Sequence, residues 1–380
     1  MRILLVSMNS LHFRRWASQL KDSGHEVFWF DILDMGYIPQ LSWMQQITDW
    51  KRSLWKSKGR TFVKKNFPGF YTKITDFTDK KVDFAFAKAM TEVQPDVVHS
   101  FVLYQSCVPI LEIMQKHAQV KWIYSSWGSD LFYFKAIRAY RKDIEAVLPW
   151  VDYMFSDCAR DQRLATEMGF AGKFFGVFPG GGGFDFDLIA KYEIPLEDRK
   201  LILIKGYQGR SGRAVPVLQA INRIAEQLTH YEILVFGADP EVLDVEFEPS
   251  LNITVLPKTK FLAHDEILKL MSKSLIYIGN SNSDGLPNTL LEAICCGAFP
   301  IQSNPGGATA EVVLHQKNGL LIENCEDANE IARLLQTALS SKKMLQESFV
   351  YNVEKLKPNY EYKKVRKKVL KTYSRIGSEV

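Results

Sequence analysis

Short apolar runs of strand length alternate with helical patterns along most of this chain, and this alternation limits the possible folds more than any other feature. Residues 2–7 and 26–32 enclose a helical pattern near the N-terminus, and residues 201–207, 232–238 and 275–281 are further apolar runs in the second half. Strands that alternate with helices favour a parallel sheet with helices packed on it. The chain is therefore expected to be an α/β protein.

One connector divides the alternation into two series. At 178–185 a proline and four consecutive glycines predict a tight, flexible turn. A chain of 380 residues is long enough for two domains. We predict an N-terminal Rossmann-like domain at 1–178, a second at 179–358, and a last helix within 359–380 that packs back on the first. Doubly wound domains bind ligands at the carboxyl ends of their strands, so the two are expected to face each other across a cleft.

A basic, aromatic stretch interrupts the first domain, and we predict an insertion there at about 40–81. Its residues 51–81 carry ten Lys or Arg side chains, with aromatic residues such as Trp55 and Tyr71 between them. A second basic run lies at 363–371. Such patches suit the anionic surface of a membrane, to which the protein would bind peripherally. The alternative is a set of solvated helices with aromatic core faces. Because no nucleic-acid-binding motif accompanies the charge, nucleic acid is not an expected partner.

The sequence predicts neither a membrane span nor a disulfide framework. No apolar run reaches the roughly 18–20 residues that cross a bilayer, and the N-terminal run is too short for a signal peptide. The five cysteines are odd in number and have no CxxC spacing, so we expect reduced thiols and no zinc site. We therefore expect a cytoplasmic protein, with the inner face of the cell membrane as its peripheral docking surface.

The most specific chemical signal lies at 281–298, where an apolar strand leads through a turn into a helix that opens near Asn288. The amide groups and the positive dipole end of a helix N-terminus form an anion site. Asp284 lies in the turn and Glu292 lies eight residues later, inside the helix. Helix capping with a solvent-facing Glu292 is the alternative. A carboxylate among Leu, Ala and Ile residues needs a partner, however, and a ligand would supply one.

This segment resembles the acidic motif of the retaining family 4 glycosyltransferases, which have the GT-B fold. The family usually begins the motif with Glu, where this chain has Asp284. By resemblance, Asp284 binds hydroxyls of the donor sugar and Glu292 holds the ribose hydroxyls. The backbone between them approaches the diphosphate or the sugar, through Gly285, Leu286, Pro287, Asn288 and Thr289.

The resemblance implies that cations for a diphosphate follow the first strand of the second domain. Lys205, Arg210 and Arg213 follow that strand, with glycines between them that permit close backbone approach. Arginine suits phosphate because its planar fork makes bidentate contacts. Arg213 matches the family Lys best, and either Lys205 or Arg210 could serve as the family Arg. The alternative for each is a solvated loop residue.

The first domain offers two weaker candidates. The loop after its first strand lacks the glycines of GxGxxG, which argues against NAD binding, and its His12 is either a cleft residue or a structural one. The segment 127–130 is similar to a family "H-G-x-D" element, but Trp127 stands in the position of the His, so no catalytic His is expected. Asp130 is either a contact to acceptor or sugar or a helix N-cap.

Two motifs are not expected to bind their usual ligands. Asp185 and Asp187 spell the DxD of a different glycosyltransferase fold, without the context of that fold, so no metal site is predicted. The glycine run at 180–183 lacks the GK[ST] of a phosphate loop.

Together these features predict a glycosyltransferase, and the resemblance to family 4 implies that it acts with retention and without a metal. Its donor would be a nucleoside-diphosphate sugar, used as a co-substrate with no further cofactor. Its acceptor would be a glycan or lipid-linked intermediate of surface polysaccharide, such as lipopolysaccharide. The expected catalytic set is Asp284, Glu292, Arg213, Lys205 and Asp130. Two alternatives remain: a sugar-nucleotide epimerase of the same fold, and a non-catalytic glycan- or lipid-binding scaffold with a decayed site.

Overall fold

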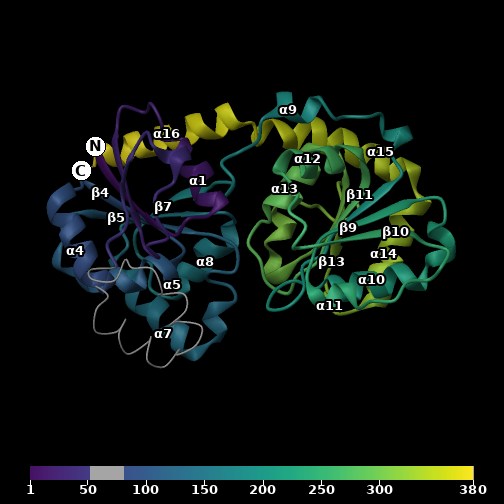
Figure 1. Cartoon of the computed structure of the whole chain (residues 1–380), viewed down its shortest axis with the longest axis horizontal. Coiled ribbons are helices and arrows are strands. Elements are labelled where there is room, and N and C mark those ends of the chain that lie inside the picture. Colours follow the sequence, from purple (N-terminus) through teal and green to yellow (C-terminus); the bar gives the residue numbers. More distant parts are fainter. Residues whose placement is uncertain (52–80, 380) are drawn as a thin grey trace, which may run out of the picture. The chain divides into compact units, whose positions relative to one another are not determined.

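The computed structural model describes residues 1–51 and 81–379, which form two compact units (Figure 1). The first unit comprises residues 1–156, 162–181 and the C-terminal residues from 368. The second comprises residues 157–161 and 182–367. Most of the insertion predicted at about 40–81 lies outside the described residues.

The first unit is built on a seven-stranded parallel sheet with the order β3-β2-β1-β4-β5-β6-β7. Its strands are β1 Arg2–Ser7, β2 Glu26–Asp31, β3 Gln45–Ile47, β4 Val97–Phe101, β5 Lys121–Ser126, β6 Tyr153–Ser156 and β7 Lys173–Val177. Its helices are α1 Leu11–Ser18, α4 Val82–Val93, α5 Leu103–Ser106, α6 Leu111–Lys116, α7 Arg138–Val147 and α8 Ala159–Glu167, the last of which begins in the second unit.

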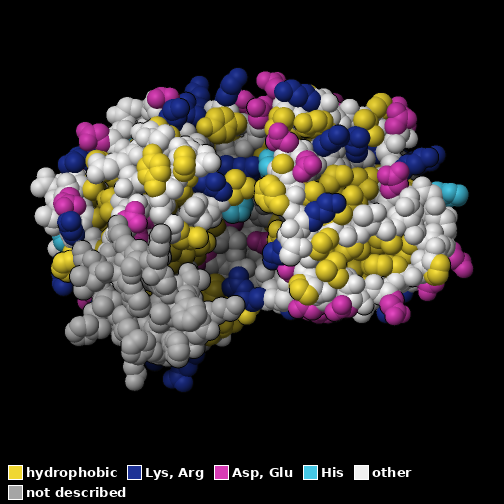
Figure 2. Space-filling model, in the orientation of Figure 1, with side chains coloured by type: hydrophobic (Ala, Val, Ile, Leu, Met, Phe, Trp, Pro, Cys, Tyr) yellow, Lys and Arg dark blue, Asp and Glu magenta, His cyan; other side chains and the backbone are white. Residues whose placement is uncertain are grey.

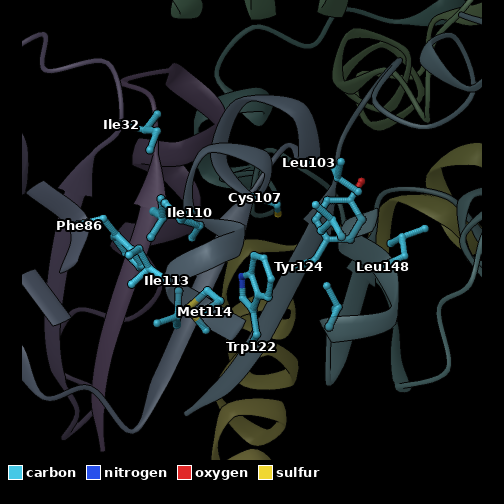
Figure 3. Close-up of a cluster of buried hydrophobic side chains, with 14 of the residues drawn as sticks. Ile32, Phe86, Leu103, Cys107, Ile110, Ile113, Met114, Trp122, Tyr124 and Leu148 are labelled. Atoms are coloured by element: carbon cyan, nitrogen blue, oxygen red, sulfur yellow. The ribbon is translucent and has the colours of Figure 1, made fainter. Parts of the chain in front are cut away.

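Both faces of this sheet are buried at its centre, which explains why β1 is apolar without interruption from Ile3 to Val6. Side chains alternate across a strand, so Leu4 and Val6 of β1 enter one core together with Phe86 of α4. Figure 3 shows part of this core, to which Phe86, Ile110 and Trp122 all contribute. On the opposite face Trp29 packs against Phe13 of α1, with their ring centroids 5.2 Å apart.

The last helix, α16 (Tyr362–Gly377), contributes its C-terminal part to the first unit. Its Tyr373 is fully buried and its hydroxyl accepts a hydrogen bond from Trp16 Nε1 at 3.3 Å. His99 of β4 also contacts this hydroxyl through Nδ1. These contacts hold the end of the chain against the face that α1 covers.

The second unit contains a six-stranded parallel sheet with the order β10-β9-β8-β11-β12-β13. Its strands are β8 Leu201–Lys205, β9 Glu232–Ala238, β10 Asn252–Pro257, β11 Ser274–Gly279, β12 Phe299–Ser303 and β13 Leu320–Ile322. Its helices are α9 Phe186–Ala190, α10 Ala214–Arg223, α11 Pro240–Leu243, α12 His264–Lys273, α13 Asn288–Cys295, α14 Ala328–Ser340 and α15 Lys342–Tyr351.

Alternation along β8 again separates two cores. Ile202 and Ile204 pack with residues of α10 and α14. Leu201 and Leu203 face the other way and pack with residues of α12 and α13. The strand order reverses between β8 and β11, as it does between β1 and β4 in the first unit. This order is that of doubly wound Rossmann-like sheets, and the prediction of two such domains in an α/β chain is confirmed.

Two further sequence features have simple structural outcomes. No helix within residues 1–51 and 81–379 is both long enough and apolar enough to cross a bilayer. Asp185 caps the N-terminus of α9, where its side chain accepts hydrogen bonds from the backbone N–H groups of Asp187 and Leu188. That contact gives the DxD sequence a local structural role.

Candidate functional site

The acidic segment and the cationic loop meet at the switch point of the second sheet. The loop after β8 and the loop after β11 both leave from the carboxyl ends of adjacent strands. They are joined by backbone hydrogen bonds of 2.9 Å, from Arg213 N–H to the Asn280 carbonyl and from Asn282 N–H to the Ser211 carbonyl. In open α/β sheets ligands bind where the strand order reverses. The two predicted halves of a donor site are therefore fixed to each other.

Glycines permit this close approach of backbone segments. A Cβ atom on Gly206 would lie 2.8 Å from Ala238 Cα, and one on Gly212 would lie 2.3 Å from the Tyr207 carbonyl oxygen. A Cβ on Gly285 would lie 2.3 Å from Asp157 Oδ1. Each position accepts only glycine without a rearrangement of its neighbours.

Helix α13 begins directly after the turn that contains Gly285, Leu286 and Pro287. Pro287 is the N-cap residue, and Asn288 and Thr289 form the first turn, whose amide groups have no acceptor within a helix. Tyr277 of β11 donates its hydroxyl hydrogen to Thr289 Oγ1 at 3.0 Å. Leu286 is buried and anchors the turn to the core.

The side chain of Asp284 lies in this turn, at the carboxyl end of β11. Its Oδ1 accepts the Gly285 N–H at 2.9 Å. Burial raises the pKa of the Asp284 carboxyl, while the positive charge of Lys205 and the Gly285 hydrogen bond lower it. The influence of Lys205 on this pKa indicates that a predicted cation and a predicted carboxylate share one electrostatic environment.

Glu292 is a buried carboxylate on α13, with only 5% of its side chain exposed. Its Oε1 lies 2.7 Å from Nε2 of His264, the first residue of α12. This excludes the alternative in which Glu292 faces solvent. His264 is not among the residues predicted from sequence, because nothing in its local sequence shows that α12 packs beside α13.

The predicted cations differ in how they are held. Arg213 pairs through Nε with Glu326, and its Nη1 donates to the carbonyls of Gly209 and Gly212 at 2.7 Å each. In this structure the guanidinium therefore binds backbone carbonyls of the loop to which Arg213 itself belongs. Arg210 is exposed on the same loop.

Lys205 belongs to a second cationic group, around Tyr207. Its Nζ lies 4.6 Å from the centroid of the Tyr207 ring, and Lys258 Nζ lies 5.1 Å from the same centroid. Lys258 also pairs with Asp239 at 3.0 Å. Since Lys258 directly follows β10, the rule that strand ends carry ligand contacts would have singled it out.

Residues 157–161 add a buried network beneath the acidic turn. Arg160, 2% exposed, donates from Nη1 to the carbonyls of Asp284 and Pro305 at 2.8 Å each. Its Nε and Nη2 donate to Asp161 Oδ1. Glu311 accepts the backbone N–H groups of Ala159 and Arg160 at 2.6 and 2.7 Å.

Asp157, Cys158 and Asp161 lie close enough together to hold a metal ion, and they are the one such group among the described residues. The Arg160 guanidinium already neutralises Asp161. Burial, followed by the charges of Asp157 and Asp161, raises the pKa of the Cys158 thiol far above its ordinary value. A protonated thiol and an arginine-paired carboxylate are poor ligands for a cation.

The candidates of the first unit lie at the carboxyl ends of its own strands. His12 is exposed on α1, and its ring centroid lies 6.3 Å from that of Trp127. Asp130 is 3% exposed, and its Oδ2 accepts hydrogen bonds from Leu103 N–H at 2.7 Å and from the Tyr124 hydroxyl at 2.5 Å. These contacts make Asp130 an anchor for the start of α5.

Comparison with known proteins agrees with this geometry. Residues 187–356 match the family model described as "Glycosyl transferases group 1". YtcC of Bacillus subtilis (strain 168) is 23% identical over 159 residues, which span 40% of this chain and 39% of that protein. The fold is similar to that of sucrose-phosphate synthase from Thermosynechococcus elongatus, with a TM-score of 0.69, 14% identity and full coverage of both chains.

The fold is also similar to that of Anabaena HepE in complex with UDP and glucose, with a TM-score of 0.69 and 12% identity. That match covers 98% of this chain and 99% of HepE. These structural similarities establish that the two Rossmann-like domains form the GT-B fold.

Proposed function

We propose that this chain, whose residues 187–356 match the model of the glycosyl transferases group 1 family, moves a sugar from a nucleoside-diphosphate donor to a hydroxyl acceptor. One observation carries the proposal. The turn that holds Asp284 and the loop that holds Arg213 are hydrogen-bonded to each other at the switch point of the second sheet. A carboxylate, a cationic loop and a helix N-terminus in one place suit a ligand with both hydroxyl and phosphate groups.

In the donor complex, each element has a distinct role. The first turn of α13 and Lys205 bind the diphosphate, whose negative charge grows as the bond to the sugar breaks. Asp284 accepts hydrogen bonds from donor-sugar hydroxyls, and Glu292 accepts them from the ribose. The presence of UDP and glucose in the HepE structure supports a donor of this class.

Arg213 joins the diphosphate contacts after a change of partner. In this structure Glu326 and two loop carbonyls hold its guanidinium. Glu326 is 58% exposed, so water can replace the arginine at little cost. A diphosphate then offers Arg213 a bidentate contact that a single carboxylate oxygen does not.

We propose that the reaction belongs to the retaining family 4 type and is metal-independent. The cations and the helix dipole balance the charge of the leaving diphosphate. The acceptor hydroxyl attacks from the face that the leaving group occupies, and its proton passes to the departing phosphate. The resemblance of the acidic motif to that of family 4 supports this route.

We further propose that the acceptor is a lipid-linked or surface-polysaccharide intermediate at the cytoplasmic face of a membrane. Helix α16 supports this proposal because it carries exposed lysines at 363, 364, 367, 368 and 371. Such a row attracts anionic lipid headgroups. On the face shown in Figure 2, cationic and anionic side chains are interspersed over both units, a distribution that does not favour nucleic acid.

The proposal is tested by turnover. The full chain is incubated with UDP-, GDP-, ADP- and dTDP-sugars and a polyprenyl diphosphate that carries one sugar residue, and the products are followed by NMR. A new glycosidic anomeric proton with the configuration of the donor supports the proposal. Epimerised donor without a glycoside, or a donor that binds and is never consumed, contradicts it.

A further inference from the structure

We infer that His264 is a positioning residue that sets the orientation of the Glu292 carboxylate toward the ribose of the donor. The inference rests on the proposed function, which assigns the ribose hydroxyls to Glu292. His264 Nε2 lies 2.7 Å from Glu292 Oε1, a distance typical of a hydrogen bond to a carboxylate.

Glu292 needs such a partner because of where α13 places it. The residues on either side of it, Leu291 and Ala293, are fully buried, and the carboxylate itself is almost fully enclosed. A buried carboxylate is costly unless it is hydrogen-bonded. The imidazole supplies a hydrogen-bond donor to Oε1 of this carboxylate.

The imidazole is itself held in place by packing. His264 opens α12, where Ala263 N–H donates to Glu266 Oε2 at 2.8 Å and so fixes the start of the helix. Further along, Leu268 and Met271 are buried in the core that also contains residues of α13. The donor nitrogen is therefore presented from one packed helix to a carboxylate on another.

This arrangement lowers the cost of binding. A carboxylate that rotates freely must be ordered when hydroxyls bind, whereas a carboxylate already fixed by a neighbouring donor loses less freedom. His264 is 27% exposed and is not assigned a contact with the reacting atoms. Its contribution is to donor binding through Glu292, with little effect on the chemical step.

Three variants separate this role from a structural one. His264→Ala removes the donor group. His264→Gln keeps an N–H donor of similar reach. Lys269→Ala changes an exposed residue on the same helix and serves as the control. Each full-length variant is titrated with the nucleotide sugar that the wild-type chain binds among the UDP-, GDP-, ADP- and dTDP-sugars. Saturation-transfer NMR reports on ribose and base protons separately, and thermal unfolding reports on the fold.

We expect His264→Ala to weaken donor binding about tenfold, as for the loss of a hydrogen bond to a charged group. Ribose signals should fall relative to base signals, and KM should rise with kcat nearly unchanged. His264→Gln should restore most of the affinity, and Lys269→Ala should behave as wild type. If His264→Ala binds the donor with wild-type affinity and an unchanged ratio of ribose to base signals, the inference about His264 is overturned while the proposed function stands. Absence of any binding by the wild-type chain would overturn the proposed function together with the inference.

Discussion

Arg160 Nη1 lies 2.8 Å from the backbone carbonyl oxygen of Asp284, so a buried guanidinium holds the turn that carries the main candidate carboxylate. The same nitrogen donates to the carbonyl of Pro305, after β12, at 2.8 Å. The rest of the guanidinium pairs with Asp161, whose side chain is not exposed at all. The buried Arg160–Asp161 ion pair therefore anchors the backbone of the turn that contains Asp284.

Arg160→Ala should therefore destabilise the protein strongly. Removing one partner of a buried ion pair costs about 3–5 kcal/mol, because the other charge remains in a medium of low polarity. The free energy of unfolding, measured by urea titration with circular dichroism, should fall by that amount. The double variant Arg160→Met/Asp161→Leu should be less destabilised than Arg160→Ala. Equal stability of wild type and Arg160→Ala would show that the guanidinium does not support the turn.

The pKa of Asp284 predicts the acid limb of donor binding. Burial raises this pKa, so the carboxylate that accepts sugar hydroxyls becomes protonated at a higher pH than an ordinary Asp, whose pKa is about 3.9. Donor affinity should fall as the pH decreases through the raised value. Calorimetric titrations across the acid range check this limb. The Asp284→Asn variant should bind the donor weakly, and its affinity should not fall in the acid range.

Lys205 offers a second test of the acid limb, because its removal should shift the limb in one known direction. Its positive charge lowers the pKa of Asp284, so Lys205→Met should move the acid limb to higher pH in addition to weakening binding. A limb that stays in place in Lys205→Met would contradict the shared electrostatic environment of the two residues.

The pair between Arg213 and Glu326 predicts a variant that binds donor more tightly. If Arg213 must leave Glu326 to reach the diphosphate, Glu326→Gln removes a competitor. The pair is partly exposed and contributes at most about 1 kcal/mol, so the gain in affinity is limited to about fivefold. Glu347→Gln, which breaks an exposed pair on α15 with the same change of charge, is the control. Weaker binding in Glu326→Gln than in the control would exclude the exchange.

Much of the second domain could be predicted from sequence because its signals are local. The apolar run of β11, the turn with Gly285 and Pro287, and the helix from Asn288 are adjacent in the chain. Alternation of strands and helices also predicts the parallel sheets, since short crossovers leave few other arrangements. The position of Glu292 among apolar residues indicated that its carboxylate needs a partner, and in the structure this carboxylate is buried beside His264.

The partners of these residues could not be predicted, because they depend on packing between distant segments. His264 reaches Glu292 across 28 residues, and Arg160 reaches the carbonyl of Asp284 across 124 residues. Each contact exists only after two elements have packed together. The pair between Arg213 and Glu326, which are 113 residues apart, also depends on the packing of distant segments. The loop sequence alone therefore could not predict it.

The most direct test of the central claim is donor binding by the wild-type chain and by Glu292→Ala. Saturation-transfer NMR of the full-length protein with UDP-, GDP-, ADP- and dTDP-sugars measures contact with each nucleotide, and thermal unfolding measures the fold of the variant. We predict that the wild-type chain binds one class of donor, and that Glu292→Ala is folded but has lost this binding and all turnover. A folded Glu292→Ala variant with wild-type binding and activity would contradict the assignment of the site.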